Sequence, residues 1–395
     1  AFFWLIVFVF VNLTSILYLG ALTIQSVMGI PLLYGVIGLA LFAVVYSING
    51  GLKAVALTDV IQVFFLVGGG LITTYIALDL LGAGEGVLKG CETLYLKTED
   101  KFHLILDPSH PGYMDLPGLS VILGGLWVAN LYYWGCNQYI IQRALAAKNI
   151  KEAQWGMAFA GVIKLLIPLL VVIPGIAAFA LDAPLSKPDE AYPWLLGNLL
   201  PVGVKGIAFA ALTAAIVSSL ASMMNSISTI FTMDIYQVYI RPEGDASHLV
   251  RVGKMTSLVA MLIGVCIAPL LSGLDQAFQY IQEFTGFVSP GALSIFLAGF
   301  FYKRATSNGA LVSAVASFVL SFVFKYLFPS LPWLDRMGII FLLCCAILVL
   351  MGKKNPKGDD ADRLLSRSLF HTDRIFNWTA LFVVIILIVF YFLWW

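Results

Sequence analysis

Two amides and two aromatic rings recur at helical spacing inside an apolar stretch, Leu126 to Arg143. They are Asn130, Tyr133, Trp134 and Asn137. This spacing predicts a single helix face. Because an amide without a hydrogen-bond partner in hydrocarbon is unfavourable in free energy, we expect this face to contact protein, water or a ligand. Amides form hydrogen bonds with hydroxyl groups, and aromatic rings pack against the C–H faces of a ligand. The pattern therefore favours a neutral polyhydroxylated ligand. A helix–helix interface with Asn bonded across it is equally consistent.

One cation lies deep in a second apolar stretch, where Lys164 precedes Leu165-Leu166-Ile167-Pro168. An ammonium group at membrane depth needs carbonyls, a carboxylate or water around it. Lys164 could donate to a ligand hydroxyl or neutralise a carboxylate at a site. The alternative is that its side chain extends to the cytoplasmic surface.

Small and hydroxylated residues line one side of the stretch 203–236. They are Ala215, Ser218, Ser219, Ser222 and Ser226. Uncharged oxygens suit a weakly held monovalent cation, and Ser218, Ser219 and the Ala215 carbonyl could each offer one to sodium. Close packing of a second helix against small residues explains the pattern equally well.

Glutamines open the stretch 276–300, which is too polar at this end for a lipid-facing helix. Asp275, Gln279 and Gln282 share a helix face, and Phe278 flanks it. Either this end of the stretch is exposed to water or the face lines a vestibule, and we favour the vestibule. In the stretch 54–81, Asp59 is ambiguous because it could also cap the helix.

The elements that must position these residues are membrane helices. Of the 395 residues, 60% are hydrophobic and 11% are charged, whereas soluble domains carry roughly 25% charged residues. The composition predicts an all-α polytopic membrane protein. The net charge of +1 gives no reason to expect a nucleic-acid partner. The cysteines lack metal or disulfide spacing and no catalytic motif lies at a plausible place, so we do not expect an enzyme.

Eleven membrane spans are predicted, separated by polar or Gly- and Pro-rich segments. They are 1–28, 32–48, 54–81, 117–140, 153–180, 203–236, 249–271, 276–300, 308–328, 337–352 and 376–395. The segment 82–116 is a long polar loop in which we expect a short helix. Lys and Arg concentrate in alternate loops, which predicts that loop 82–116 and the C-terminus lie outside, in the extracellular or periplasmic space. The chain opens at Ala1 within an apolar stretch, so we expect a truncated start.

Four long stretches carry a resemblance to a known family. They read GLWVANLYYW (125–134), TDVIQVFF (58–65), AAIVSSLAS (214–222) and QAFQYIQ (276–282). Through them the chain resembles the sodium/solute symporter family, and within it the bacterial sodium/galactose symporters. Looser signatures of the family are imperfect at Ser47 and Phe300, and the loop 182–192 is shorter than the family pattern.

The resemblance implies a LeuT-like inverted-repeat fold. Residues 1–81 would be the last three helices of the first repeat, and 117–300 the second repeat. The segment 82–116 would be an outer loop, and 301–395 would hold additional helices. Three helices at the start of the first repeat would be missing from this chain.

The resemblance also implies site residues. Positions that hydrogen-bond the sugar are Asn130, Lys164 and Gln282. Positions of the aromatic gate and wall are Tyr133, Trp134 and Phe278. Positions of the sodium ligands are Ala215, Ser218 and Ser219. Asp59 matches an acidic residue on the path by which the cation leaves its site.

These observations predict a sodium-driven importer of galactose or glucose, working by alternating access in the inner (cell) membrane. Its partners would be the sugar, the co-transported sodium ion and the lipid bilayer. The alternatives are a sodium symporter for an inositol or a carboxylate, and, in a different class, a membrane enzyme or scaffold. The sequence leaves the sugar, the sodium stoichiometry and the oligomeric state undetermined.

Overall fold

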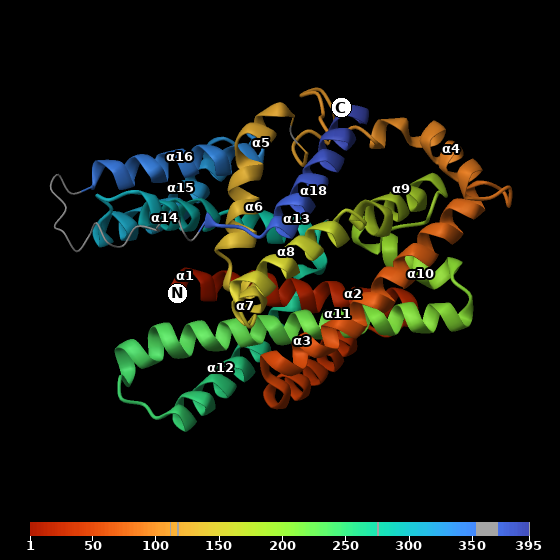
Figure 1. Cartoon of the computed structure of the whole chain (residues 1–395). Helices are drawn as coiled ribbons and strands as arrows, with labels where there is room; N and C mark the ends of the chain where they lie inside the picture. The colour runs from red at the N-terminus through yellow and green to blue at the C-terminus, as the bar shows by residue number, and fades with distance from the viewer. Residues whose placement is uncertain (111, 117, 275, 353–369, 395) are drawn as a thin grey trace. The chain divides into compact units, whose positions relative to one another are not determined.

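The computed structural model describes residues 1–110, 112–116, 118–274, 276–352 and 370–394, with only the backbone given for 48–55. Across these residues all regular structure is helical (Figure 1). The chain divides into two compact units. One comprises Ala1–Phe102 and Lys164–Ile281, and the other comprises His103–Ile163 and Gln282–Trp395. We describe each unit by itself.

The first unit holds the long helices of the chain's first quarter and middle. Its α-helices are α1 (Phe2–Ile6), α2 (Thr14–Met28), α3 (Leu32–Leu81), α4 (Val87–Thr98), α9 (Ile173–Ala180), α10 (Ala191–Leu199), α11 (Val202–Thr229), α12 (Ala246–Ile267) and most of α13 (Ala277–Thr285). Three π-helical segments extend them, at Val7–Leu13, Pro168–Val172 and Ile230–Ile240. Short 3-10 turns lie at Glu99–Lys101, Pro188–Glu190 and Ala268–Gly273.

Small residues bring the helices of the first unit close together. A Cβ at Gly69 of α3 would lie 3.2 Å from the Cβ of Ala208 of α11, and a Cβ at Gly35 of α3 would lie 3.2 Å from Ala21 of α2. Such close backbone approach is how membrane helices associate. It fixes α3 beside α11, the two helices that carry Asp59 and Ser218.

The segment predicted as an outer loop, 82–116, contains the helix that the sequence predicts there. Helix α4 packs Leu94 into a buried cluster with Leu78, Leu81 and Ala177. Helix α4 is therefore anchored to α3 and α9 by apolar burial.

The second unit begins with short helices and ends with long ones. Its helices are α5 (Leu119–Leu123), α6 (Gly125–Gly135), α7 (Gln138–Leu145), nearly all of α8 (Ile150–Lys164), the end of α13, α14 (Ser289–Phe301), α15 (Ser307–Leu327), α16 (Trp333–Leu350) and α18 (Arg374–Leu393). Gly125 places the start of α6 against α16, because a Cβ there would lie 1.9 Å from the Leu334 carbonyl oxygen.

A buried seam of serines joins α14 to α15. The Gly291 N–H donates to Ser317 Oγ at 3.0 Å, and Ser317 Oγ donates to the Phe287 carbonyl at 2.9 Å. The hydroxyls of Ser294 and Ser313 lie 3.1 Å apart. These bonds satisfy polar groups that would otherwise be buried unpaired.

Within the described residues, nine helical stretches are long and apolar enough to cross a membrane. They are Phe2–Met28, Ala56–Leu81, Ile150–Ala180, Val202–Ile240, Ala246–Gly273, Ala277–Phe301, Ser307–Leu327, Trp333–Leu350 and Arg374–Leu393. They confirm the predicted class of helical multi-pass membrane protein. The predicted span 32–48 corresponds to a shorter apolar stretch, Leu32–Ser47.

Two predicted boundaries are wrong. Helix α3 continues from Leu32 to Leu81, although a break was predicted at 49–51. Glycine in a helix costs only about 1 kcal/mol relative to alanine, and an apolar setting favours keeping the backbone hydrogen bonds. The predicted span 117–140 is instead divided among α5, α6 and α7, because the chain leaves helical geometry at Gly124 and again at Cys136.

Candidate functional site

Helix α6 carries three of the four residues predicted to share one face, Asn130, Tyr133 and Trp134. Asn130 is exposed, and its Nδ2 donates to the Leu126 carbonyl of the preceding turn at 2.9 Å. The rings of Tyr133 and Trp134 meet edge to face, with centroids 5.2 Å apart. The side chains of Asn130 and Trp134 therefore lie on the exposed surface of the second unit, with Tyr133 half-buried beside them.

The prediction that Asn137 shares this face is wrong. Helix α6 ends at Gly135, where the sequence allowed a break, and Asn137 is the N-cap of α7. Its Oδ1 accepts the Tyr139 N–H at 3.0 Å, and the residue is 1% exposed. An Asn before a new helix satisfies one of the free N–H groups at the helix start, so this amide serves the fold.

Two further predicted sugar-site residues lie on α13, in different units. Phe278 is 65% exposed on the first turn, and Gln282 is half-buried on the last turn. The division between the units falls between them, after Ile281. Asp275, predicted to share the face of Gln282, lies outside the described residues.

A loop of the first unit fixes the start of α13. Asp189 Oδ2 accepts the N–H of Ala277 at 2.9 Å, and Lys187 Nζ donates to the carbonyls of Ser272 and Leu274. Burial raises the pKa of the Asp189 carboxyl, although the Ala277 N–H and the Lys187 charge act in the opposite direction. The loop thus holds the turn that carries Phe278.

The predicted sodium ligands meet an acid of another helix. Ser218 Oγ of α11 donates to Asp59 Oδ1 of α3, and Ser218 is 4% exposed. Ala215 and Ser219 lie one turn apart on the same helix and are half-buried. The structure therefore brings together oxygens from a hydroxyl and a carboxylate, a donor set that suits a hard cation.

Lys164 is the last residue of α8, inside the membrane-length stretch Ile150–Ala180. Its side chain is exposed, and it belongs to the first unit while the rest of α8 belongs to the second. Among the described residues, no cluster of three or more His, Cys, Asp or Glu side chains could hold a metal ion.

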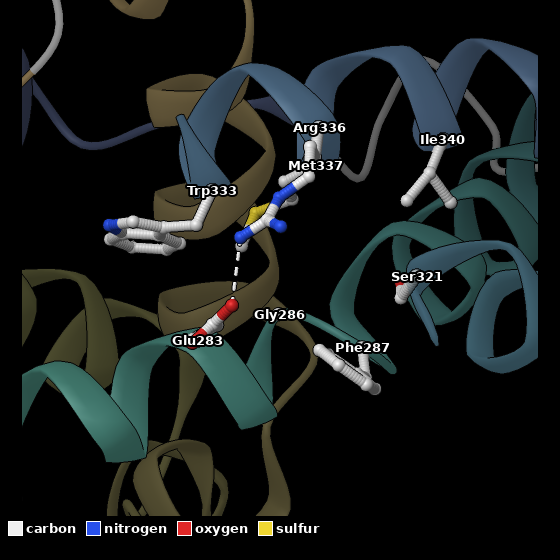
Figure 2. Close-up of a pocket in the computed structure, with 8 residues that line it drawn as sticks. All are labelled: Glu283, Gly286, Phe287, Ser321, Trp333, Arg336, Met337 and Ile340. Carbon is white, nitrogen blue, oxygen red and sulfur yellow. Dashed lines mark hydrogen bonds and ion pairs between the residues drawn. The ribbon is translucent and has the colours of Figure 1, made fainter. Parts of the chain in front are cut away.

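The ion pairs at the end of α13 were not predicted from the sequence. Glu283 Oε1 lies 2.8 Å from Arg336 Nη2, and Glu283 Oε2 lies 3.1 Å from Lys325 Nζ. Figure 2 shows the first of these pairs beside a small cavity. The sequence places one acidic and two basic residues near the ends of three neighbouring spans, which is a possible sign of ion pairing. Which of these residues pair with one another could be seen only in the tertiary structure.

Comparison with known proteins gives a consistent result. A family model for the sodium:solute symporter family matches residues 1–316. The chain is 50% identical over 414 residues to the sodium/glucose cotransporter of Vibrio parahaemolyticus, covering 100% of this chain and 76% of that protein. It is 32% identical over 347 residues to sodium/myo-inositol cotransporter 2 of Bos taurus, covering 80% of this chain and 51% of that protein. The chain thus spans about half the length of this second relative.

A solved structure shares the fold. It is a Na⁺-coupled sialic acid symporter in a substrate-bound outward-open state, with a TM-score of 0.74 and 22% sequence identity. The match covers 88% of this chain and 73% of that one. At this identity the likeness shows the fold, which agrees with the predicted LeuT-like helical architecture.

Proposed function

Because this chain belongs to the sodium:solute symporter family, we propose that it is a sodium-coupled sugar symporter that works by alternating access. The observation that carries this proposal is the 50% identity to a sodium/glucose cotransporter along the whole chain. The protein is a multi-pass membrane transporter and not an enzyme, and sodium is its co-transported ion.

We place the sodium ion at α11, on Ala215, Ser218 and Ser219. The contact between Ser218 and Asp59 supports this, because a carboxylate beside the hydroxyl lowers the electrostatic energy of a cation there. Asp59 would then receive the ion as it leaves Ser218. The remaining oxygens would come from unwound backbone between repeats, as in inverted-repeat transporters.

We place the sugar against Asn130, Gln282 and Lys164, with Tyr133 stacking on its ring. Trp134 and Phe278 would form the neighbouring aromatic wall and gate. An exposed amide and a half-buried amide are suitable donors and acceptors for hydroxyl groups. One lysine among amides favours a neutral polyol over a carboxylate substrate.

The repeat assignment and the orientation belong to this proposal. Residues 1–81 and 117–300 would form the inverted repeats, and 301–395 the additional helices. Loop 82–116 and the C-terminal end would face the extracellular or periplasmic side of the cell membrane, as the distribution of Lys and Arg predicts.

Sodium and sugar would be coupled through a shared conformational equilibrium. Each ligand should then tighten the binding of the other by the same factor. An inositol is the second candidate solute, because the chain is 32% identical to a sodium/myo-inositol cotransporter.

The test is uptake of radiolabelled galactose, glucose and myo-inositol by the protein reconstituted in liposomes. An inward sodium gradient should drive accumulation of one of the hexoses, and replacement of sodium by choline should abolish it. Sodium-independent uptake, or chemical change of the solute, would refute the proposal. Preferential uptake of myo-inositol would select the second candidate.

A further inference from the structure

Glu283 follows Gln282 on the last turn of α13 and joins that turn to two other helices. Its Oε1 accepts from Arg336 of α16 at 2.8 Å, and its Oε2 accepts from Lys325 of α15 at 3.1 Å. Figure 2 shows the Arg336 side chain extending from α16 toward the carboxylate. All three residues belong to the second unit, so the two bonds lie within one compact body.

The partial burial of these ion pairs restricts the position of the Glu283 side chain. The side chain of Arg336 is 11% exposed and that of Glu283 is 21% exposed. Charge-assisted hydrogen bonds are short and directional, and removing one member of a partly buried group leaves its partners unpaired. Glu283 therefore has one favourable position, set by two cations on separate helices.

The last turn of α13 depends on such contacts. The helix has nine residues, and helices this short are not stable by themselves. Its end is also confined sterically, because a Cβ at Gly286 would lie 2.7 Å from Met337 Cε. Lys325 Nζ lies 4.7 Å from the ring centroid of Phe284 on the same turn. The turn is thus held from the α15 and α16 sides.

We propose that Glu283 is a positioning residue for Gln282: its ion pairs with Arg336 and Lys325 fix the last turn of α13 and so set the affinity for sugar. The inference rests on the proposed function, in which the Gln282 amide bonds a sugar hydroxyl. Glu283 acts through the backbone of the turn and does not itself touch the sugar.

The test is a double-mutant cycle in sodium-driven sugar uptake by the reconstituted protein. The variants are E283Q, Q282A and the pair Q282A/E283Q. We expect E283Q to raise the sugar KM by roughly five- to tenfold, the effect of losing one well-placed hydrogen bond. The maximal rate should stay within about twofold, and E283Q should add little in the Q282A background because its effect passes through Gln282.

A matched control removes a pair that has no such role. Glu92 pairs with Lys89 at 2.9 Å on the exposed surface of α4, and E92Q should leave the sugar KM unchanged. If E283Q does not yield folded protein, E283D keeps the charge with a shorter reach and should raise the KM by a smaller factor. In the charge swap E283R/R336E, the sugar KM should recover toward the wild-type value relative to E283R.

The outcomes separate the two proposals. An unchanged sugar KM in folded E283Q, with Q282A impaired, would overturn this inference alone. This inference alone would also be overturned if E283Q raised the sugar KM by the same factor in the wild-type and Q282A backgrounds. Equal factors would mean that Glu283 has a general structural role that does not pass through Gln282. A normal sugar KM in Q282A would overturn the role of Gln282 in the proposed function, and this inference with it.

Discussion

The hydroxyl of Ser218 on α11 donates a hydrogen bond to the carboxylate of Asp59 on α3, joining two residues that are far apart in the sequence. Ser218 is buried, and Asp59 is half-buried. The contact links the predicted sodium ligand to the acid predicted on the ion's path.

Removing either group should weaken sodium binding. For S218A and D59N we expect the sodium concentration for half-maximal uptake to rise by roughly tenfold, because each loses one oxygen or its charge. Sodium-dependence curves of sugar uptake measure this. Asp79 lies on the same helix as Asp59, and D79N is the control that should behave as wild type. Normal sodium dependence in both S218A and D59N would place the ion elsewhere.

Two exposed asparagines with the same local hydrogen bond, Asn130 and Asn198, allow a matched test of the proposed sugar site. Its amide donates to the carbonyl four residues before it at 2.9 Å, and the exposed Asn198 of α10 does the same to Trp194 at 2.9 Å. N130A should raise the sugar KM by roughly tenfold, which corresponds to the loss of one hydrogen bond to the substrate. N198A loses the same local bond and should keep the normal KM. Equal effects in the two variants would mean that the helix bond, and not the sugar, is responsible.

The proposed orientation can be checked with a native cysteine. Cys91 is exposed on α4, so a membrane-impermeant maleimide should label it from outside intact cells, and C91S should remove that signal. Ser247 is the second residue of the span Ala246–Gly273, next to the segment 241–245 that follows the span Val202–Ile240, and we place this end in the cytoplasm. A cysteine introduced by S247C in the C91S background should react only after the cells are opened. The reverse pattern would invert the topology.

Close packing of α14 against α15 predicts a difference between two glycines. A Cβ at Gly291 would lie 2.5 Å from the Cβ of Ser317, whereas a Cβ at Gly299 would meet nothing within 4 Å. G291A should therefore destabilise the protein by about 1–3 kcal/mol. G299A should be neutral or slightly stabilising, since alanine favours helix. Thermal unfolding in detergent compares the two, and equal melting temperatures would contradict the packing described for Gly291.

A pH effect is expected where α8 meets α18. The Trp155 indole N–H and the Ile375 backbone N–H donate to Asp373 Oδ1. These bonds lower the pKa of the Asp373 carboxyl below its usual value. A lowered pKa means that the carboxylate stabilises the folded state above its unfolded pKa of about 3.9, and that this is lost as pH falls through the folded pKa.

The measurement is the melting temperature of wild type and D373A across pH. The wild type should melt higher near pH 7, and the difference should shrink as the pH is lowered below about 4. W155F removes the largest cause of the pKa shift. The difference in melting temperature between wild type and W155F should therefore be smaller than that between wild type and D373A. A difference that grows on acidification would contradict the assigned sign.

Several conclusions needed only the sequence. The membrane class follows from 60% hydrophobic and 11% charged residues, because burial of apolar surface in lipid depends on composition more than on contacts. The line of small residues through Ala215, Ser218 and Ser222 follows from helical periodicity alone. The short helix within the predicted outer loop was also predicted correctly.

Other features required the tertiary structure, because they depend on where one helix ends or on partners distant in the chain. Asn137 belongs to a cap instead of a ligand face, since the helix stops two residues earlier. Glycines near residue 50 do not interrupt α3, since neighbouring hydrogen bonds outweigh their low helix preference. The pairing of Glu283 with Arg336 and Lys325 joins residues 53 and 42 positions apart. Periodicity reports the face of a helix, and only packing decides which charged groups meet.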